Sequence, residues 1–363
     1  MQGSANTAHT ADAIIAGGGI IGLSLALELL RRGLSVTVVE RQQAMSAASW
    51  AAGGMLAVDD PQNPPALMPL CTLSRNLYPS FLEQVESLSG QRVPLRTRQA
   101  LQHIDAQKHA GFRLATREEI AALAPGLQPE DLQFALLEEG SLDPNDLRAS
   151  LPAAVRTAGG QVLEQTEVLN IEAGASGVRV QTSQGLLSAG IFVNCCGAWA
   201  GADALGGLPV LPVKGQMLNL YCAPERLRAV VRAPGVYMIP RGEGRVTIGA
   251  TLENAGFDEN VDEASIAALE QQARALLPEL APMPQAERWA GLRPATPDAL
   301  PVLGAAAMAH CWHATGHYRD GILLAPATAH LMAQLILGET PEIPLGSFAP
   351  ERFAAERKLR AAS

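Results

Sequence analysis

The sequence predicts an α/β fold in which a discontinuous first domain is interrupted by a second domain. Three observations support this. Residues 13–40 have the strand–helix–strand pattern of a parallel α/β unit, and a strand followed by a helix recurs at 311–337. Between them, residues 211–252 alternate apolar and polar side chains, as antiparallel strands do. At 363 residues the chain is long enough for two domains with substantial cores.

The first α/β unit carries a glycine motif. A short apolar run ends at Gly17-x-Gly19-x-x-Gly22, and a helical pattern follows. Gly17 permits a tight turn, Gly19 lets the backbone approach a pyrophosphate, and Gly22 lets the helix pack closely on the strand. A second apolar run, at 36–39, ends at Glu40, where an acid accepts hydrogen bonds from a ribose. The unit therefore predicts a Rossmann-like dinucleotide site, and the acid favours FAD or NAD over NADP.

The apolar character of residues 13–30 also raises the alternative of a signal peptide or a membrane helix. The segment before it contains no Lys or Arg, which a secretory signal requires. The Gly17–Gly19 triplet and Glu28 are unfavourable in a membrane helix, and no other long apolar run follows. We therefore expect no membrane span, and we expect residues 1–11 to be an extension outside the fold.

Composition narrows the classes of partner. The net charge of −9, from 27 basic and 36 acidic residues, disfavours nucleic acid and anionic membranes. The five cysteines form no C-x-x-C pair, and Cys195-Cys196 lie in an apolar strand pattern typical of a core, so a reducing cytoplasm is expected. The seven histidines show no metal-binding spacing, so no metal is predicted.

The remaining elements follow from periodicity, caps and turns. Further helices are expected at 67–89, 116–125, 145–158, 262–277 and 323–337. Further strands are expected at 161–163, 168–172, 178–181, 190–196 and 311–315. Thr116 and Glu119 form a capping-box pattern, Asp143 or Asn145 caps the helix at 145–158, and residues 240–244 are expected to form a hairpin turn.

Five segments, which occur in the family's order, resemble the FAD-dependent amine oxidases of the D-amino-acid oxidase group, and within it the glycine oxidases of thiamine biosynthesis. These segments are 51–56, 211–216, 237–251, 289–298 and 314–328. The resemblance implies a Rossmann-like FAD-binding domain interrupted by an α+β substrate domain with a mixed, largely antiparallel sheet. The expected FAD-binding domain comprises 1–82, 146–212 and 293–363, and the substrate domain comprises 83–145 and 213–292.

The resemblance also implies an activity. Glycine, sarcosine or small D-amino acids such as D-alanine would be oxidised to glyoxylate or another 2-oxo acid, ammonia and hydrogen peroxide, with O2 as acceptor. Three alternatives stay open: a D-amino-acid dehydrogenase that passes electrons to a carrier, a sarcosine-type oxidase, and a non-enzymatic flavoprotein subunit. The family also implies a homotetramer that supplies the thiazole branch of thiamine biosynthesis.

Four residues match the family's substrate-binding positions. Arg293, followed by Pro294, matches the arginine that binds the substrate carboxylate, and a guanidinium suits this role because it presents two parallel N–H donors. Tyr237 matches a tyrosine that donates to the same carboxylate, Arg319 a second arginine, and Leu252 a pocket residue. Taken alone, an arginine is more often a surface ion-pair partner, and a tyrosine in an alternating strand is more often in the core. No acid or base is assigned, because an amine that enters neutral needs none.

Matching positions also imply the cofactor contacts. Besides the three motif glycines and Glu40, the implied FAD-binding residues are Ile20, Ile21, Arg41, Ala48, Ser49, Gly53, Gly54, Met55, Val168, His317, Tyr318, Arg319, Asp320, Gly321, Ile322 and Leu323. No cysteine occupies the flavin-linking position, so noncovalent FAD is expected. Pro326 is expected in the first turn of the closing helix.

The sequence departs from the family at four of these or neighbouring positions. Asp320 replaces an asparagine, Tyr318 a phenylalanine and Leu252 a methionine. Gly235 replaces a histidine, which favours room for a larger amine. These departures affect the expected substrate range and not the cofactor.

Overall fold

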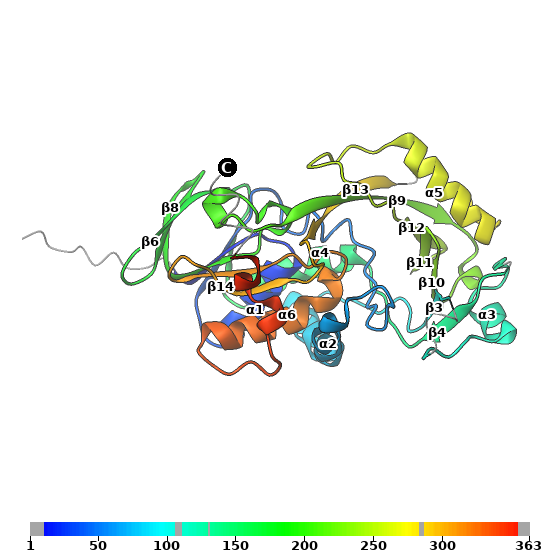
Figure 1. Ribbon diagram of the computed structural model, residues 1–363, viewed down its shortest axis with the longest axis horizontal. Helices are drawn as coiled ribbons and strands as arrows, with labels where there is room; N and C mark the ends of the chain where they lie inside the picture. The colour runs from blue at the N-terminus through cyan, green and yellow to red at the C-terminus, as the bar shows by residue number, and fades with distance from the viewer. Residues whose placement is uncertain (1–10, 106–110, 130, 283–286, 355–363) are drawn as a thin grey trace, which may run out of the picture.

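The computed structural model describes residues 11–105, 111–129, 131–282 and 287–354, which form two β-sheets with helices around them (Figure 1). The first sheet has the strand order β14-β15-β8-β1-β2-β5, and from β15 to β5 its strands are parallel. These strands are β1 (Ala11–Ala16), β2 (Val36–Val39), β5 (Gln161–Leu163), β8 (Gly185–Asn194), β14 (Val302–Ala305) and β15 (Cys311–Thr315). A hairpin of β6 (Val168–Ala173) and β7 (Val178–Thr182) joins β8 antiparallel. The Rossmann-like prediction is confirmed.

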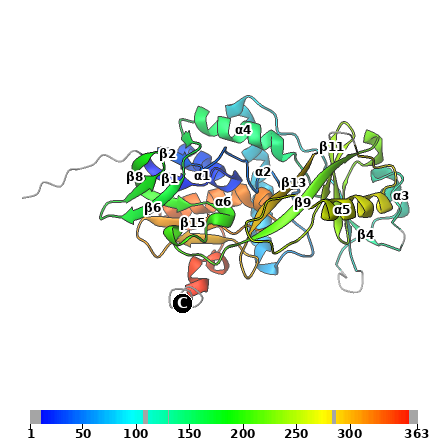
Figure 2. The ribbon, with the colours of Figure 1, turned by 90° about the horizontal axis from the view of Figure 1, so that it is seen from above.

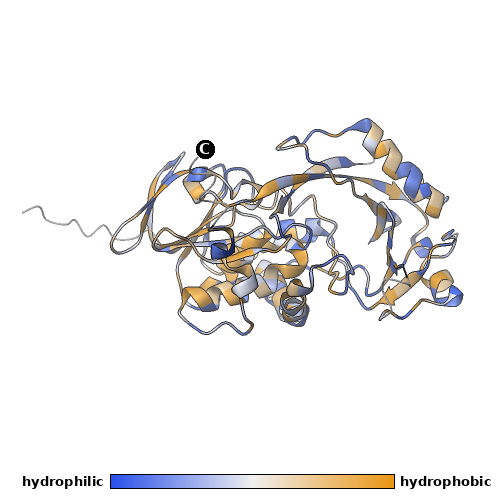
Figure 3. Ribbon diagram, in the orientation of Figure 1, coloured by the Kyte–Doolittle hydropathy of each residue, from blue (hydrophilic) through white to orange (hydrophobic). Residues whose placement is uncertain are grey.

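Four helices pack beside the first sheet, as Figure 2 shows from above. They are α1 (Ile20–Arg31), α2 (Met68–Ser89), α4 (Pro144–Thr157) and α6 (Gly321–Ile336). Helices α1 and α6 are buried along most of their lengths, and Figure 3 shows α6 as mostly hydrophobic. Both helices contribute to the largest apolar core of the described chain, which fixes their positions beside the sheet.

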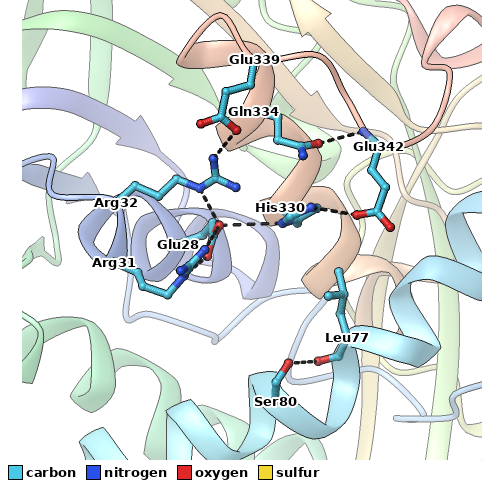
Figure 4. Close-up of polar contacts among 9 residues, drawn as sticks. All are labelled: Glu28, Arg31, Arg32, Leu77, Ser80, His330, Gln334, Glu339 and Glu342. Atoms are coloured by element: carbon cyan, nitrogen blue, oxygen red, sulfur yellow. Dashed lines mark hydrogen bonds and ion pairs between the residues drawn. The ribbon is translucent and has the colours of Figure 1, made fainter.

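Polar side chains join α1 and α6 at their far ends (Figure 4). Glu28 on α1 accepts from Arg31 and Arg32, and Arg32 also pairs with Glu339 at 2.7 Å. His330 on α6 lies 3.9 Å from Glu28 and 3.1 Å from Glu342. Because these pairs are partly exposed, each contributes little, and the apolar contact between the two helices dominates.

The second sheet has the strand order β13-β9-β12-β11-β10-β3-β4. Its strands are β3 (Ala100–His103), β4 (Phe134–Leu137), β9 (Leu211–Tyr221), β10 (Val230–Ala233), β11 (Val236–Gly242), β12 (Arg245–Gly249) and β13 (Arg288–Ala295). All neighbouring pairs are antiparallel except β3 with β10, which confirms a mixed, largely antiparallel sheet.

Helix α5 (Glu263–Leu276) packs on one face of the second sheet (Figure 2). Apolar residues such as Leu218, Met238 and Ile248 share a buried cluster with this helix. Since side chains alternate along a strand, the residues next to them, such as Tyr237, face the opposite side. The second sheet therefore offers its other face to the first domain.

Short helices complete the fold. Helix α3 (Arg117–Leu123) is capped by Thr116. The Thr116 side chain accepts from Glu119 N–H while the Glu119 side chain accepts from Thr116 N–H, so the predicted capping box is confirmed. The 3-10 helices are Pro65–Leu67, Gly197–Trp199, Asp203–Leu205, Pro224–Arg226, Gly346–Phe348 and Pro350–Phe353. Asp143, and not Asn145, caps α4.

Four element predictions need correction. The strand expected at 190–196 is β8 and ends at Asn194, so Cys195 and Cys196 follow the strand. The expected turn at 240–244 is shorter, because Pro240, Arg241 and Gly242 belong to β11. Ala11 already belongs to β1, and the rest of the expected extension, residues 1–10, lies outside the described residues.

The closing helix also begins earlier than predicted, at Gly321, so Pro326 lies in its second turn. Proline lacks the N–H that would bond the carbonyl of Ile322 four residues back. The hydroxyl of Tyr78 on α2 donates to this carbonyl at 2.6 Å instead. A proline inside the helix is therefore compensated by a side chain that is distant in sequence.

The division into domains at 82, 145, 212 and 292 remains a prediction. Two of its boundaries fall inside single strands, β9 and β13, which pair along their whole lengths in the second sheet. No helix within the described ranges is long and apolar enough to cross a membrane.

Candidate active site

The glycine motif forms the turn that the sequence predicts. Gly17 follows β1 with φ of +106°, and a methyl group there would overlap the carbonyl of Cys195. A methyl group at Gly22 would overlap the carbonyl oxygen of Gly17 and meet Ile15 Cγ2 at 3.2 Å. The start of α1 therefore packs directly on the turn, and its N-terminus faces the cleft.

Glu40 lies at the end of β2, next to this turn. Its Oε2 accepts from the N–H of Gly18 at 2.7 Å, and its Oε1 accepts from the N–H of Gln42 at 2.8 Å. Each carboxylate oxygen has two lone pairs, so both can still accept from a ribose hydroxyl. The expected ribose acceptor is thus held in place by the glycine turn itself.

The loop at 51–56 is held by a buried arginine. Arg241 donates to the carbonyls of Gly53 (2.8 Å) and Leu142 (2.5 Å) and to Thr247 Oγ1 (3.0 Å). Burial lowers the pKa of Arg241 to about 10, so its guanidinium stays charged. Gly54 has φ of +65° and touches Leu142 so closely that no side chain fits. Arg241 therefore positions a loop whose residues line the cleft.

These parts surround one cavity of about 520 Å³, which is within the usual range for cofactor and ligand sites. Almost all residues predicted to bind the cofactor line it: Gly17, Gly19, Ile20, Ile21, Glu40, Arg41, Ala48, Ser49, Gly53, Gly54, Met55, Val168, His317, Tyr318, Arg319, Asp320, Gly321 and Ile322. Gly22 and Leu323 are buried behind the wall instead. Arg293, Tyr237 and Leu252 line the same cavity.

Arg293 and Tyr237 lie beside each other at a place where glycines leave room for their side chains. Gly215 is paired with Gly291 between β9 and β13, and a methyl group at Gly215 would overlap the Arg293 guanidinium. A methyl group at Gly249 would lie 2.6 Å from the ring of Tyr237. Arg293 Nη1 donates to the carbonyl of Thr251 at 3.2 Å, which leaves most of its N–H donors for a ligand.

Tyr237 is held neutral in this position. Burial raises the pKa of its hydroxyl, while the neighbouring Arg293 guanidinium lowers it in part. The hydroxyl therefore remains an O–H donor at neutral pH, beside a permanent cation. Together the two side chains offer a carboxylate a charged fork and one neutral donor.

The segment before α6 contributes a second charged group. Arg319 donates to Gln62 Oε1 at 2.6 Å, and its Nη2 lies 3.8 Å from Asp60 Oδ2. Burial raises the pKa of the Asp320 carboxyl to about 7, with Arg319 opposing the rise and Asp60 adding to it. Burial lowers the pKa of His317 to about 3, so this imidazole is neutral and hydrogen-bonded to Thr328 Oγ1 (3.0 Å).

Local sequence motifs do not identify some of the residues that line the cavity. Arg41 lies 3.7 Å over the ring of Trp199, which in turn stacks on Phe257. Trp199 and Cys196 follow β8, whose parallel pairing with β1 brings this turn beside the glycine motif. The sequence feature that could have identified them is the glycine turn after a buried parallel strand, because such turns meet at one edge of the sheet.

The structure shows the surroundings of two residues that depart from the family pattern. Leu252 is 64% exposed at the mouth of the cavity, so it borders the opening and does not close it. A methyl group at Gly235 would point toward Gln272 Oε1 at 3.1 Å, and φ is +76°. Gly235 therefore serves the turn between β10 and β11, and it also lines the cavity. That it leaves room there for a larger amine stays a prediction.

The cavity fits an FAD. The turn at Gly17 and Gly19 and the N-terminus of α1 suit the pyrophosphate. The carboxylate of Glu40 suits the ribose of the adenosine. The N-terminus of α6 reaches the same cavity near Arg293, where a flavin ring would lie. No group of three or more His, Cys, Asp or Glu within the described segments could hold a metal, and the cysteines described there are free thiols.

Fold and cavity define a Rossmann-like dinucleotide-binding protein that has a cationic side chain, Arg293, in the same cavity. The chain belongs to the family of FAD-dependent oxidoreductases, since the family model described as "FAD dependent oxidoreductase" matches residues 12–335. It is thus an FAD-dependent enzyme, as the sequence predicted.

Several relatives are called glycine oxidases. The chain is 37% identical to the glycine oxidase of Pseudomonas aeruginosa over 358 residues, which covers 93% of this chain and 98% of the relative. The crystal structure of glycine oxidase from Geobacillus kaustophilus is similar with a TM-score of 0.86 and 32% identity, covering 95% of this chain and 99% of that one. The chain is also 37% identical to a bifunctional protein ThiO/ThiG of Trichormus variabilis, with 95% of this chain covered and 55% of that relative.

Replacement of Glu40 by alanine is expected to weaken FAD retention. The ribose would lose a charged acceptor, and each such bond contributes roughly 1.5–3 kcal/mol. The measurement is the dissociation constant of FAD from the apoprotein, with Glu40→Gln as the matched control that keeps the size of the side chain and loses the charge. An FAD affinity equal to wild type in Glu40→Ala would place the ribose elsewhere.

Gly215→Ala is expected to raise the KM for an amino-acid substrate by about 10- to 100-fold, because misplacing a clamping group by about 1 Å costs this much. The three atoms nearest to the methyl group all belong to the end of the flexible Arg293 side chain, so the fold and FAD content should be retained. In an Arg293→Ala background the same change should have little further effect. Additive losses in the double variant would contradict this arrangement.

Asp320→Asn is expected to stabilise the protein at pH 8 and to change its stability little at pH 4. The unfolded carboxyl ionises near pH 4, whereas in the folded protein its pKa is about 7. The folded state therefore holds the extra proton between these values, and wild-type stability falls as the pH rises through this window. We expect a Tm gain of ~2–4 °C at pH 8. An equal gain in Tm at both pH values would contradict a raised pKa of the Asp320 carboxyl.

Proposed function

We propose that this enzyme is a glycine oxidase that also accepts small amines and D-amino acids such as sarcosine and D-alanine. Glycine, O2 and water would give glyoxylate, ammonia and hydrogen peroxide. When bound, FAD accepts two electrons from the amino acid and passes them to O2. The relatives named glycine oxidase support this substrate.

The observation that carries the proposal is the Arg293–Tyr237 pair in the cavity that also contains the glycine turn. Arg293 binds the substrate carboxylate through two parallel N–H donors, and Tyr237 adds its O–H. This fixes the α C–H with respect to the wall that α6 forms. The positive end of α6 at Gly321 stabilises negative charge on a bound ring. No acid or base is assigned, since a neutral amine needs none.

A second part of the proposal concerns the oligomeric state, the compartment and the pathway. We propose a cytoplasmic homotetramer that serves the thiazole branch of thiamine biosynthesis. The similarity to proteins named ThiO/ThiG supports this pathway, and the free thiols Cys71, Cys195, Cys196, Cys222 and Cys311 suit a reducing compartment. Light scattering of the purified holoenzyme measures the mass, and a monomer would refute the tetramer.

Steady-state assays test the activity. Glycine, sarcosine and D-alanine are offered to the holoenzyme in air, while O2 uptake and hydrogen peroxide are measured. We expect uptake and peroxide with glycine. Glycine oxidation that requires a quinone and yields no peroxide would indicate the dehydrogenase, a strong preference for sarcosine would indicate the sarcosine-type oxidase, and no turnover would indicate a non-enzymatic subunit.

A further inference from the structure

The cavity extends past Tyr237 to a second polar wall. Arg232 on β10 is paired in register with Tyr237 on β11 and with Gln102 on β3. Directly paired residues point to the same face of a sheet, with Cβ atoms about 5 Å apart. All three residues line the cavity, so Gln102, Arg232 and Tyr237 form a continuous row that leads to Arg293.

The first two side chains of this row have unused hydrogen-bonding groups. Arg232 and Gln102 are each 6% exposed. Arg232 Nε and Nη1 and Gln102 Oε1 are buried and make no hydrogen bond within the described part of the chain. Gln102 Nε2 donates to the carbonyl of His103 at 2.8 Å, which fixes the direction of its Oε1. Leaving such groups unpaired is costly, which favours a ligand that pairs them.

The charges around Arg232 define the ligand. Its Nη2 donates to Glu139, which is 4% exposed, and its Nη1 lies 3.7 Å from Asp60 Oδ2. The guanidinium charge is therefore already compensated, and a carboxylate placed here would be repelled by both acids. A neutral group that both accepts from Arg232 and donates to Gln102 fits this wall, which describes a hydroxyl or a carboxamide.

We propose that Arg232 and Gln102 form a second subsite, which binds a neutral hydroxyl or carboxamide on substrates larger than glycine. The inference rests on the proposed function, because Arg293 and Tyr237 hold the carboxylate of the same substrate. The subsite discriminates by hydrogen bonding, since an apolar group of equal size would leave Arg232 and Gln102 unpaired.

The test uses pairs of substrates of nearly equal size. For the wild-type holoenzyme we expect kcat/KM for D-serine to exceed that for D-2-aminobutyrate by about 10-fold or more, and D-asparagine to exceed both D-leucine and D-aspartate. Absent turnover of glycine would refute the proposed function itself. Normal glycine turnover with equal values within each pair would refute the subsite alone, and a preference for D-aspartate would show a carboxylate site instead.

Variants assign the preference to these residues. Gln102→Met should reduce the ratio of D-serine to D-2-aminobutyrate at least fivefold, whereas Gln99→Met, a change just before β3 and outside the cavity wall, should keep it. Because Arg232→Met alone would leave Glu139 buried without its partner, the second variant combines Arg232→Met with Glu139→Gln and should abolish the ratio. An unchanged ratio in Gln102→Met, or an equal loss for glycine, D-serine and D-2-aminobutyrate, would overturn the proposal.

Discussion

Arg293→Ala is expected to bind FAD normally and to lose amino-acid turnover. Arg293 lines the cavity with most of its N–H donors free, and it lies beside the neutral hydroxyl of Tyr237. Removing a bidentate charged contact in a shielded pocket costs about 2–5 kcal/mol. This corresponds to a loss of roughly 30-fold to several-thousand-fold in kcat/KM for glycine.

Two comparisons make this result specific. Arg293→Lys should recover only part of the activity, since an ammonium cannot present a planar fork. Carboxylate inhibitors such as glycolate should lose affinity in parallel, while amines without a carboxylate should be affected much less. Near wild-type oxidation of glycine by Arg293→Ala would show that the clamp lies elsewhere, with Arg319 as the next candidate.

Gly22→Ala is expected to lose FAD and to unfold at a lower temperature. The added methyl group would overlap the carbonyl oxygen of Gly17, and a backbone atom cannot move aside as a side chain can. The turn and α1 must separate, which costs roughly 1–3 kcal/mol and spoils the approach to the pyrophosphate. We expect FAD affinity to fall at least ~10-fold, with Tm measured on the same samples.

Gly346→Ala is the matched control, because a methyl group there would meet no atom within 4 Å. It should retain wild-type FAD content and Tm to within about 1 °C. Wild-type FAD occupancy in Gly22→Ala would contradict the close packing of helix and turn.

The local parts of the site could be predicted from the sequence. The glycine turn and the cap at Thr116 depend on spacings of a few residues, and the structure has both as predicted. Glu40 lies beside the glycine turn, where the strand–helix–strand pattern placed it. The predicted first-turn position of Pro326 is wrong, because the preference of proline for the first turn takes only the helix itself into account. The donor that replaces its missing N–H comes from Tyr78, on another helix.

The far wall of the cavity could not be predicted in this way. Gln102 and Arg232 become neighbours only because β3 pairs with β10, although a long stretch of chain separates these strands. Trp199 joins the cofactor cleft for the same reason, through the pairing of β8 with β1. Sequence periodicity gives the face of a strand but not its partner, so sites that depend on strand order need the fold.

The most direct test of the account is the anaerobic addition of glycine to the yellow holoenzyme. We expect the visible flavin absorbance to bleach, and air to restore it with one hydrogen peroxide formed for each glyoxylate. Acid denaturation should then release intact FAD, as expected for noncovalent binding. An absorbance that glycine leaves unchanged, in a protein whose flavin a chemical reductant still bleaches, would contradict the claim that this cavity holds FAD and an amino acid side by side.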